Sequence, residues 1–252
     1  MDIIRVDSTE STNALAWELL KERNAPFAVM AHTQTAGRGQ RGNHWESEPG
    51  RNVTLSIAWC PGQVAASEQF VISQAVAVAI VETLRHFMPE LTPEIAIKWP
   101  NDIYVGQRKI CGVLIENSLS GCRISRTVIG IGLNVNQRTF LSDAPNPVSM
   151  FQLTRKTFDV NEVALQLCNT VEHFFNALLL PHRHSRLRGR YFSMLWRSVG
   201  YWPYLDVEAD ELFEARVSNI APSGHITLTE RSGHQRTFAF KEVQSVFNSI
   251  LQ

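Results

Sequence analysis

The sequence has little that would place it in a membrane or outside the cell. Its most apolar run, residues 76–81, is far shorter than the about 20 apolar residues that cross a bilayer as a helix. The first residues, MDIIRVDSTESTN, lack both the basic segment and the apolar segment of a signal peptide. We therefore expect a cytoplasmic protein that has no membrane partner.

Paired cysteines and a net charge are also missing. The four cysteines, Cys60, Cys111, Cys122 and Cys168, form no C-x-x-C pair, which favours scattered reduced thiols over a disulfide framework. Lysine plus arginine equals aspartate plus glutamate at 24 each, so no overall field draws the protein to nucleic acid or to an anionic membrane. Any anion must be bound by a local cluster of cations.

The signatures of several large enzyme classes are absent as well. The sequence has no G-x-x-x-x-G-K-[ST] loop, no kinase signature set and no G-x-S-x-G nucleophile elbow. It has no H-E-x-x-H motif, and His182 and His184 have no third candidate ligand nearby, so we predict two solvated histidines and no metal site. The 252 residues, 44% hydrophobic and 19% charged, are typical of a soluble globular protein with one large domain or a large and a small one.

Hydrophobic periodicity predicts an α+β protein. The predicted helices cover residues 13–22, 67–88, 163–178 and 187–196. The predicted strands cover residues 27–33, 53–59, 94–99 and 127–136, with a hairpin over 102–117. Short β-rich runs follow at 212–220, 225–230, 236–240 and 243–247, and their close spacing predicts a small antiparallel barrel. We expect a mixed central sheet packed with helices in residues 1–200 and the barrel in residues 201–252.

Residues 35–47, TAGRGQRGNHWES, contain the pattern G-x-G-x-x-G. In a dinucleotide-binding unit the third glycine opens a helix, whose N-terminus holds the pyrophosphate. Here Pro49 and Gly50 follow and lead directly into a strand, so that interpretation fails. The backbone N–H groups, Arg38 and Arg41 instead suit a loop that wraps a phosphate. A plain surface loop with solvated arginines remains the alternative.

A second group of cations follows in KWPND, where Lys98 ends a predicted strand, and eleven residues later at Lys109. Either lysine alone would be read as solvated. Together with the two arginines and the polar turn at residues 11–13, four cations in a protein of zero net charge predict a polyanionic ligand such as ATP.

Four motifs now carry a family resemblance. STESTN, TQTAGRGQRGNHW, KWPNDIYVGQRKICGVLIE and GIGLNVN occur in the order and spacing of the biotin protein ligases, the biotin–[acetyl-CoA-carboxylase] ligases. The sequence resembles this family over nearly its whole length. The resemblance implies a catalytic domain like those of class II aminoacyl-tRNA synthetases and biotin ligases, followed by a Src-homology-3-like barrel. It also implies two steps: biotin and ATP form biotinyl-5′-AMP and pyrophosphate, and the biotinyl group then passes to one lysine of a biotin carboxyl carrier protein.

The resemblance assigns residues to each part of this chemistry. The implied catalytic residues are Lys98, Arg38 and Lys109. The implied biotin-binding residues are Ser11, Thr12, Asn13, Gln34, Gly37, Arg38, Gly39, Gln40, Trp45, Lys98 and Gly112. The implied nucleotide-binding residues are Asn13, Arg38, Arg41, Lys98, Lys109, Gly132 and Asn134. For Trp45 a place in the core, and for the two strand glycines simple close packing, remain open alternatives.

The cofactors implied are ATP and Mg²⁺, with the ion held mainly by the phosphates and Asp102 in a structural role. Some members of the family repress transcription through an N-terminal DNA-binding domain of about sixty residues. This sequence starts only a few residues before STESTN, so we expect a catalyst that does not bind DNA. We expect a monomer or a weak homodimer.

The sequence departs from the family pattern at two places. Gln40 and Asn43 stand where the family's loop often has arginine, which predicts faster release of the adenylate than in an arginine-bearing relative. The segment 138–148, expected as a loop, has only Phe140 where the family often has a tryptophan against adenine. A lipoate-type protein ligase and a non-catalytic biotin- or nucleotide-binding regulator are the alternative functions.

Overall fold

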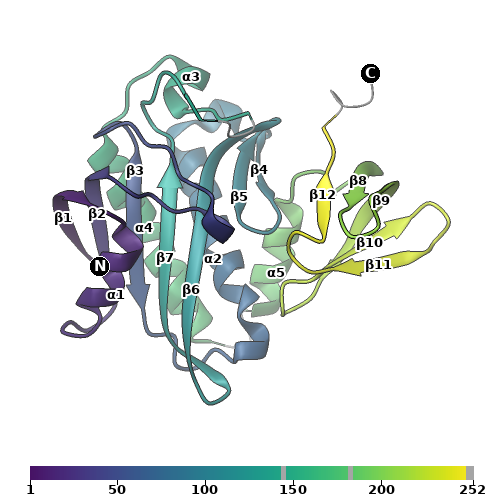
Figure 1. Cartoon of the computed structure of the whole chain (residues 1–252), viewed down its shortest axis with the longest axis horizontal. Helices are drawn as coiled ribbons and strands as arrows, with labels where there is room; N and C mark the ends of the chain where they lie inside the picture. Colours follow the sequence, from purple (N-terminus) through teal and green to yellow (C-terminus); the bar gives the residue numbers. More distant parts are fainter. Residues whose placement is uncertain (143–145, 181–183, 248–252) are drawn as a thin grey trace.

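The computed structural model describes residues 1–142, 146–180 and 184–247 of the chain, and leaves the side chain of Arg41 undescribed. Two sheets and the helices packed on them make up the protein (Figure 1). The strands of the first sheet are β1 Asp2–Thr9, β2 Phe27–Gln34, β3 Val53–Trp59, β4 Ile95–Lys98, β5 Asp102–Val105, β6 Arg108–Ser120 and β7 Arg123–Leu133. The helices are α1 Thr12–Leu19, α2 Phe70–Phe87, α3 Met150–Thr154, α4 Val160–Leu178 and α5 His184–Ser193. The second sheet consists of β8 Trp202–Asp206, β9 Glu211–Ile220, β10 Ile226–Glu230, β11 Gln235–Phe238 and β12 Val243–Ser245.

The first sheet is mixed, as predicted, with the strand order β1-β2-β3-β7-β6-β5-β4. β1 runs parallel to β2, and the remaining neighbours are antiparallel. Because side chains alternate along a strand, each strand divides its residues between two faces. Leu55 and Ile57 of β3 and Ile131 of β7 join the core formed with α2 and α4. Ala58 and Val128, from the same two strands, pack on the opposite face in a smaller cluster with α1.

Helix α2 forms the centre of the core, and most of its side chains are buried. Within Ala66–Phe87 the most apolar window of 18 residues has a mean hydropathy of 1.4, and the helix is long and apolar enough to cross a membrane, so residues 76–81 alone underestimated its apolar length. However, 72% of its most apolar window is buried inside the protein. This burial is typical of the core helix of a globular protein.

The second sheet has the order β11-β10-β9-β8-β12 with antiparallel neighbours. The predicted small β-unit is thus confirmed, but the strand pairs of the described residues form an open sheet and do not close it into a barrel. This sheet lies beside the β4–β5 edge of the first sheet and α5 (Figure 1). Trp99 Nε1 joins the two parts by donating to the Gly224 carbonyl oxygen at 3.0 Å. The domain boundary at residue 200 stays a prediction.

Candidate functional site

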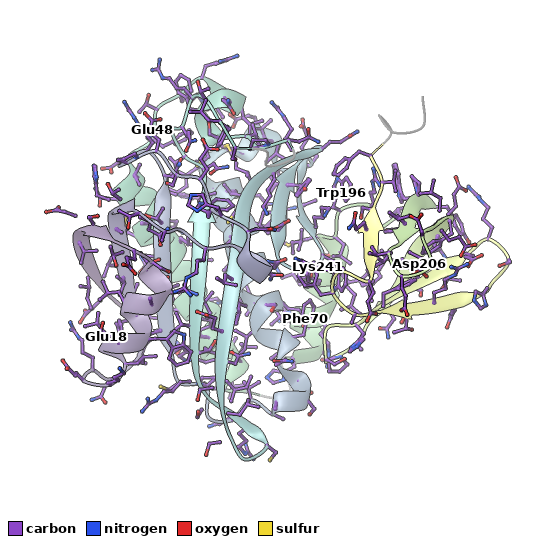
Figure 2. The ribbon with its side chains drawn as sticks, in the orientation of Figure 1. Glu18, Glu48, Phe70, Trp196, Asp206 and Lys241 are labelled. Carbon is purple, nitrogen blue, oxygen red and sulfur yellow. The ribbon has the colours of Figure 1, made fainter. Side chains whose placement is uncertain are left out.

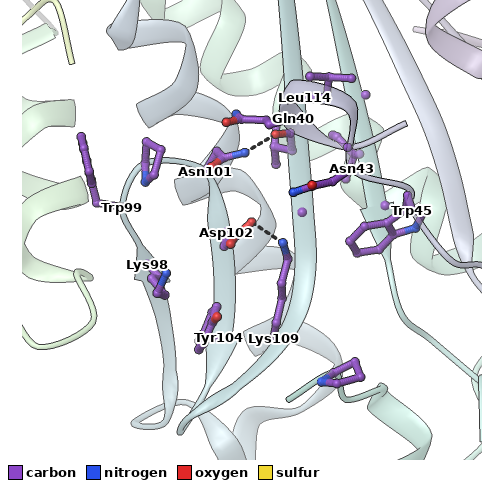
Figure 3. Close-up of a pocket in the computed structure, with 18 of the residues that line it drawn as sticks. Gln40, Asn43, Trp45, Lys98, Trp99, Asn101, Asp102, Tyr104, Lys109 and Leu114 are labelled. Atoms are coloured by element: carbon purple, nitrogen blue, oxygen red, sulfur yellow. Dashed lines mark hydrogen bonds and ion pairs between the residues drawn. The ribbon is translucent and has the colours of Figure 1, made fainter. Parts of the chain in front are cut away.

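A cavity of about 820 Å³ opens on the face of the first sheet that α2 does not cover, and extends to the second sheet (Figure 3). It brings together segments that are far apart in the sequence: the start of α1, the glycine-arginine loop (residues 35–47), the β4–β5 turn and β6–β7. Among the residues implied for the site, the following line it: Ser11, Thr12, Asn13, Gln34, Arg38, Gly39, Gln40, Trp45, Lys98, Lys109, Gly112, Gly132 and Asn134. Gly37 lies beneath Trp45 rather than in the lining, and the side chain of Arg41 is outside the described part.

The start of α1 forms a polar pocket of uncharged groups. Ser11, Thr12 and Asn13 are 4%, 3% and 4% exposed. Gln34 Oε1 accepts from the Thr12 backbone N–H at 2.8 Å and from its hydroxyl at 3.0 Å. Beneath them, Ser56 Oγ lies 2.7 Å from Thr12 Oγ1 and 2.6 Å from Asn13 Oδ1. These bonds fix the hydroxyls and the amide in place before any ligand arrives.

The Asn13 amide has a second anchor, on strand β6. Its Nδ2 donates to Glu116 Oε2 at 2.8 Å, and Trp17 Nε1 donates to the same oxygen at 3.3 Å. Glu116 belongs to β6, so this carboxylate joins the long hairpin to α1. The sequence analysis did not single out Ser56 or Glu116. Each is a polar residue in a strand that turns toward the site. The pattern of a single sequence does not distinguish such a residue from a polar residue that faces solvent.

Three glycines make a trough in the sheet at the centre of the cavity. Gly112 and Gly132 are paired across β6 and β7. The indole of Trp45 lies directly over both, and a Cβ on Gly112 would come within 2.9 Å of Trp45 Cζ3. Gly130 lies beneath Asn13 in the same way. Close packing under these side chains therefore explains why no larger residue fits here.

The two lysines of the site lie on strands β4 and β6, on either side of β5. Lys98 ends β4, Asp102 begins β5 and Lys109 lies on β6 (Figure 3). Lys109 Nζ forms an ion pair with Asp102 Oδ1 at 2.7 Å. Lys98 Nζ lies 5.4 Å from the centre of the Tyr104 ring. The predicted convergence of the two lysines is therefore observed, together with a carboxylate between them.

Burial lowers the pKa of Lys98 below its usual value. Asp102 opposes this effect by raising the pKa of Lys98, and the positive charges of Lys109 and Arg197 lower it further. The lysine is thus held where its positive charge lacks full solvation. An anion in the cavity would relieve this cost, so the site is suited to bind phosphate or carboxylate oxygens.

The glycine-arginine loop folds back on itself as a short bridge. Arg38 pairs with His44, Gly39 N donates to the Asn43 carbonyl oxygen at 2.6 Å, and residues 40–42 form one turn of 3₁₀ helix. This single turn does not continue into a longer helix, which agrees with the conclusion from the sequence that the loop is not a dinucleotide-binding fingerprint. Arg38 is exposed at the mouth of the cavity.

Two buried polar atoms at the cavity have no hydrogen-bond partner among the described residues. They are Trp45 Nε1, a donor, and Asn134 Oδ1, an acceptor. Asn134 is 2% exposed, and its Nδ2 donates to the Val148 carbonyl oxygen at 3.1 Å. Because buried polar groups are normally paired, these two atoms mark places where a ligand can supply the partner.

The second sheet also contributes to the cavity, which the sequence analysis left open. Trp196 and Lys241 lie where the two sheets meet (Figure 2). Trp196 contacts Tyr104 and Phe247 with ring centres 5.5 Å away in each case, and Arg197 stacks on Trp196 at 4.0 Å. Such contacts between distant segments leave no local pattern in the sequence.

The described residues contain no group of three histidine, cysteine, aspartate or glutamate side chains placed to hold a metal ion. Asp102, the acidic residue nearest the lysines, is paired with Lys109. His184 is buried and its Nε2 lies 3.0 Å from the Leu178 carbonyl oxygen, so it is not the solvated residue predicted; His182 is outside the described residues.

Comparison with known proteins places this fold and site in a family. Residues 5–134 match the model of the biotin/lipoate A/B protein ligase family. The bifunctional ligase/repressor BirA of Bacillus spizizenii is 34% identical over 243 residues, covering 94% of this chain and 72% of that protein. The chain therefore belongs to the biotin/lipoate A/B protein ligase family.

Other relatives match more narrowly. BirA of Salmonella typhimurium is 33% identical over 137 residues, 54% of this chain and 42% of that protein, so the chain spans about two fifths of its length. Among solved structures, biotin protein ligase from Aquifex aeolicus in complex with biotin and ATP has a TM-score of 0.76 at 22% identity, covering 97% of this chain and 99% of that one. This likeness shows that the two chains share a fold.

Proposed function

We propose that this protein is an ATP-dependent biotin protein ligase. In the first step the biotin carboxylate attacks the α-phosphorus of ATP, a new bond forms between the two, and the bond to pyrophosphate breaks. In the second step the amine of a carrier lysine attacks the carbonyl carbon of biotinyl-5′-AMP, and AMP leaves. The observation that carries the proposal is one cavity that joins an uncharged polar pocket to a cluster of cations across a glycine trough.

The polar pocket suits the ureido ring of biotin. A cyclic urea offers two N–H donors and one carbonyl acceptor and carries no charge. The Thr12 hydroxyl and the Gln34 amide are already oriented by each other, and together with the Ser11 hydroxyl they can pair with all three groups. Trp45 above the glycines supplies an apolar wall for the carbon chain that leads to the carboxylate.

The cations are placed at the other end, where the reacting carboxylate and the phosphates would meet. Lys98 and Lys109, with Arg38 at the mouth, offset the negative charge that grows at the α-phosphate as the new bond forms. Loss of one such preorganised donor costs on the order of 3 kcal/mol in a barrier. No nucleophilic side chain is required, since both steps depend on positioning and charge.

The nucleotide would occupy the side of the cavity near Asn134, Gly132 and Phe140, with Asn13 contributing from the biotin side. We keep Arg41 as a predicted nucleotide contact from the sequence alone. The unpaired Asn134 Oδ1 can accept from an amino group such as that of adenine. Mg²⁺ would enter with ATP and be held by its phosphates, because Asp102, the carboxylate beside the lysines, is already paired with Lys109.

The remaining parts of the proposal concern the whole protein. We propose a biotin carboxyl carrier domain as the partner, no DNA target, a cytoplasmic location and a monomer or weak homodimer. Residues 1–200 would hold the chemistry, and residues 201–252 would complete the cavity wall through residues such as Lys241.

A test of the proposal is the release of pyrophosphate from Mg-ATP with biotin, with lipoate or with neither. We expect pyrophosphate release only in the reaction that contains biotin. Lys98→Ala should reduce kcat/KM at least a hundredfold, whereas Lys156→Ala, an exposed lysine outside the cavity lining, should not change it. Release with lipoate in place of biotin would indicate a lipoate-type ligase, and binding without release would indicate a regulator.

A further inference from the structure

Glu46 links two loops that line the cavity and lie 95 residues apart in the sequence. It directly follows Trp45 in the glycine-arginine loop. Its Oε1 accepts from the Leu141 backbone N–H at 2.9 Å and from Gln137 Nε2 at 3.1 Å. Its Oε2 accepts from the Ser142 backbone N–H at 2.8 Å. One carboxylate thus holds the segment 137–142 at three points.

Gln137 fixes the same two segments from the inside. It is 1% exposed, and its Oε1 accepts from the Glu48 backbone N–H at 3.1 Å and from Asn52 Nδ2 at 2.5 Å. Its carbonyl oxygen accepts from Ser149 Oγ at 2.6 Å, at the start of α3. Glu48 lies at this end of the protein, close to α3 (Figures 1 and 2). The contact is therefore anchored to the core on both sides.

The Glu46 carboxylate is suited to stay ionised in this position. Burial by itself would raise its pKa, but hydrogen bonds from Ser142, from the Leu141 N–H and from Gln137 together lower the pKa below the usual value. The nearby charged groups are occupied elsewhere: Arg51 faces Glu48 at 3.9 Å, and Arg138 stacks on Phe151 at 4.6 Å. Glu46 thus acts on backbone donors, which fixes geometry more strictly than a surface ion pair does.

We propose that Glu46 is a positioning residue that couples the two substrate subsites by tying Trp45 to the segment that carries Phe140 and Ser142. This inference rests on the proposed function, in which Trp45 walls the biotin chain and Phe140 lies at the nucleotide side. Trp45, Glu46, Phe140 and Ser142 all line the cavity. When one ligand orders its loop, the carboxylate holds the other loop in its binding position. Such coupling is reciprocal, so each ligand should tighten the binding of the other by the same factor.

The test compares Glu46→Gln with Glu48→Gln. The first variant keeps the size of the side chain but turns an N–H₂ group toward a backbone N–H donor. The matched control lies two residues away, outside the cavity lining. Calorimetry would give the dissociation constant of biotin with and without a non-hydrolysable ATP analogue. A stopped-flow chase would give the dissociation rate of biotinyl-5′-AMP.

In the wild type and in Glu48→Gln we expect the analogue to tighten biotin binding about tenfold, within the usual range of such couplings. In Glu46→Gln the ATP analogue should tighten biotin binding by less than about twofold, and biotinyl-5′-AMP should dissociate about tenfold faster. The dissociation constant of biotin without the analogue should change little. Glu46→Asp, which keeps the charge on a shorter side chain, should give intermediate values and tests the proposal if Glu46→Gln folds poorly.

Equal coupling in Glu46→Gln and the wild type would overturn the inference, as would the absence of coupling in the wild type. Either result would leave the proposed function intact. Failure of the wild type to bind biotin at all would instead overturn both. A loss of stability in Glu46→Gln with unchanged coupling would show that the residue serves the fold alone.

Discussion

At the scale of single residues, the site depends on three glycines, which have no side chain to fill the cavity. Gly112, Gly130 and Gly132 present no side chain on the cavity face, and this allows Trp45 and Asn13 to lie against the sheet. The sequence analysis singled out Gly112 and Gly132, with ligand approach and close packing as open alternatives, and it did not single out Gly130. The distinction requires the position of Trp45, which comes from a segment about 70 to 90 residues away in the sequence.

We predict that Gly132→Ala displaces the Trp45 indole, because its Cβ would overlap the ring. Biotin affinity should fall at least tenfold, about 1.4 kcal/mol. The control is Gly189→Ala in α5, where a Cβ meets nothing within 4 Å. That change should leave biotin affinity unchanged and raise the free energy of unfolding by about 0.5–1 kcal/mol through helix propensity. Equal biotin affinity in Gly132→Ala and the wild type, measured by calorimetry, would contradict the account.

A second residue-scale prediction concerns pH. Lys98 must be protonated to offset phosphate charge, and its pKa in the free protein is lowered from 10.5, chiefly by burial. Since kcat/KM reports groups of the free enzyme, kcat/KM for pyrophosphate release should fall with rising pH at an apparent pKa below 10.5. Asp102 raises the pKa of Lys98, so Asp102→Asn should move this limb to lower pH. If the fall in kcat/KM moves to higher pH in Asp102→Asn, the role assigned to Lys98 is wrong. Circular dichroism over the same pH range controls for unfolding.

At the scale of elements, the start of α1 is held by the strand beneath it. Ser56, 0% exposed on β3, contacts both Thr12 and Asn13. Ser56→Ala should remove the donor to Asn13 Oδ1, leaving Thr12 Oγ1 with Gln34 as its partner, at a cost of about 1–3 kcal/mol. We expect biotin to bind about tenfold more weakly. Thr83→Ala, at an equally buried hydroxyl on α2, should lower the melting temperature without changing biotin affinity. If both variants bind biotin like the wild type, Ser56 has no part in the site.

The elements also show how far the sequence could predict the fold. Strands with clear alternation, such as β3, and long apolar helices, such as α2, were predicted close to their observed bounds. β1 and β8 were missed, because β1 is an edge strand with an irregular burial pattern and β8 follows directly on an aromatic turn. α3 has only five residues and depends on a capping box between Ser149 and Gln152. Helix propensity over so few residues carries no signal.

At the scale of the whole molecule, the two sheets share one core. Tyr204, Phe213 and Val217 of the second sheet belong to the same buried cluster as the residues around α2. Trp99 and Arg197 donate to carbonyl oxygens of Gly224 and Val246 across the junction. The sequence predicted a small β-unit after residue 200 but could not show that it completes the cavity, since these contacts join residues that are 125 and 49 positions apart.

We therefore predict that the protein unfolds in a single cooperative transition, despite its two sheets. Differential scanning calorimetry should give one peak whose calorimetric and van't Hoff enthalpies agree. Biotin and the ATP analogue together should move the whole peak to higher temperature. Two resolved peaks, with only one of them moved by the ligands, would show that the second sheet folds independently and takes no part in the site.

The most direct test of the central claim is mass spectrometry of a biotin carboxyl carrier domain after incubation with this protein, biotin and Mg-ATP. The account predicts a carrier with one biotin, attached to a single lysine, and no such product with Lys98→Ala or without ATP. An unmodified carrier, in the presence of wild-type protein that binds both biotin and ATP, would contradict it.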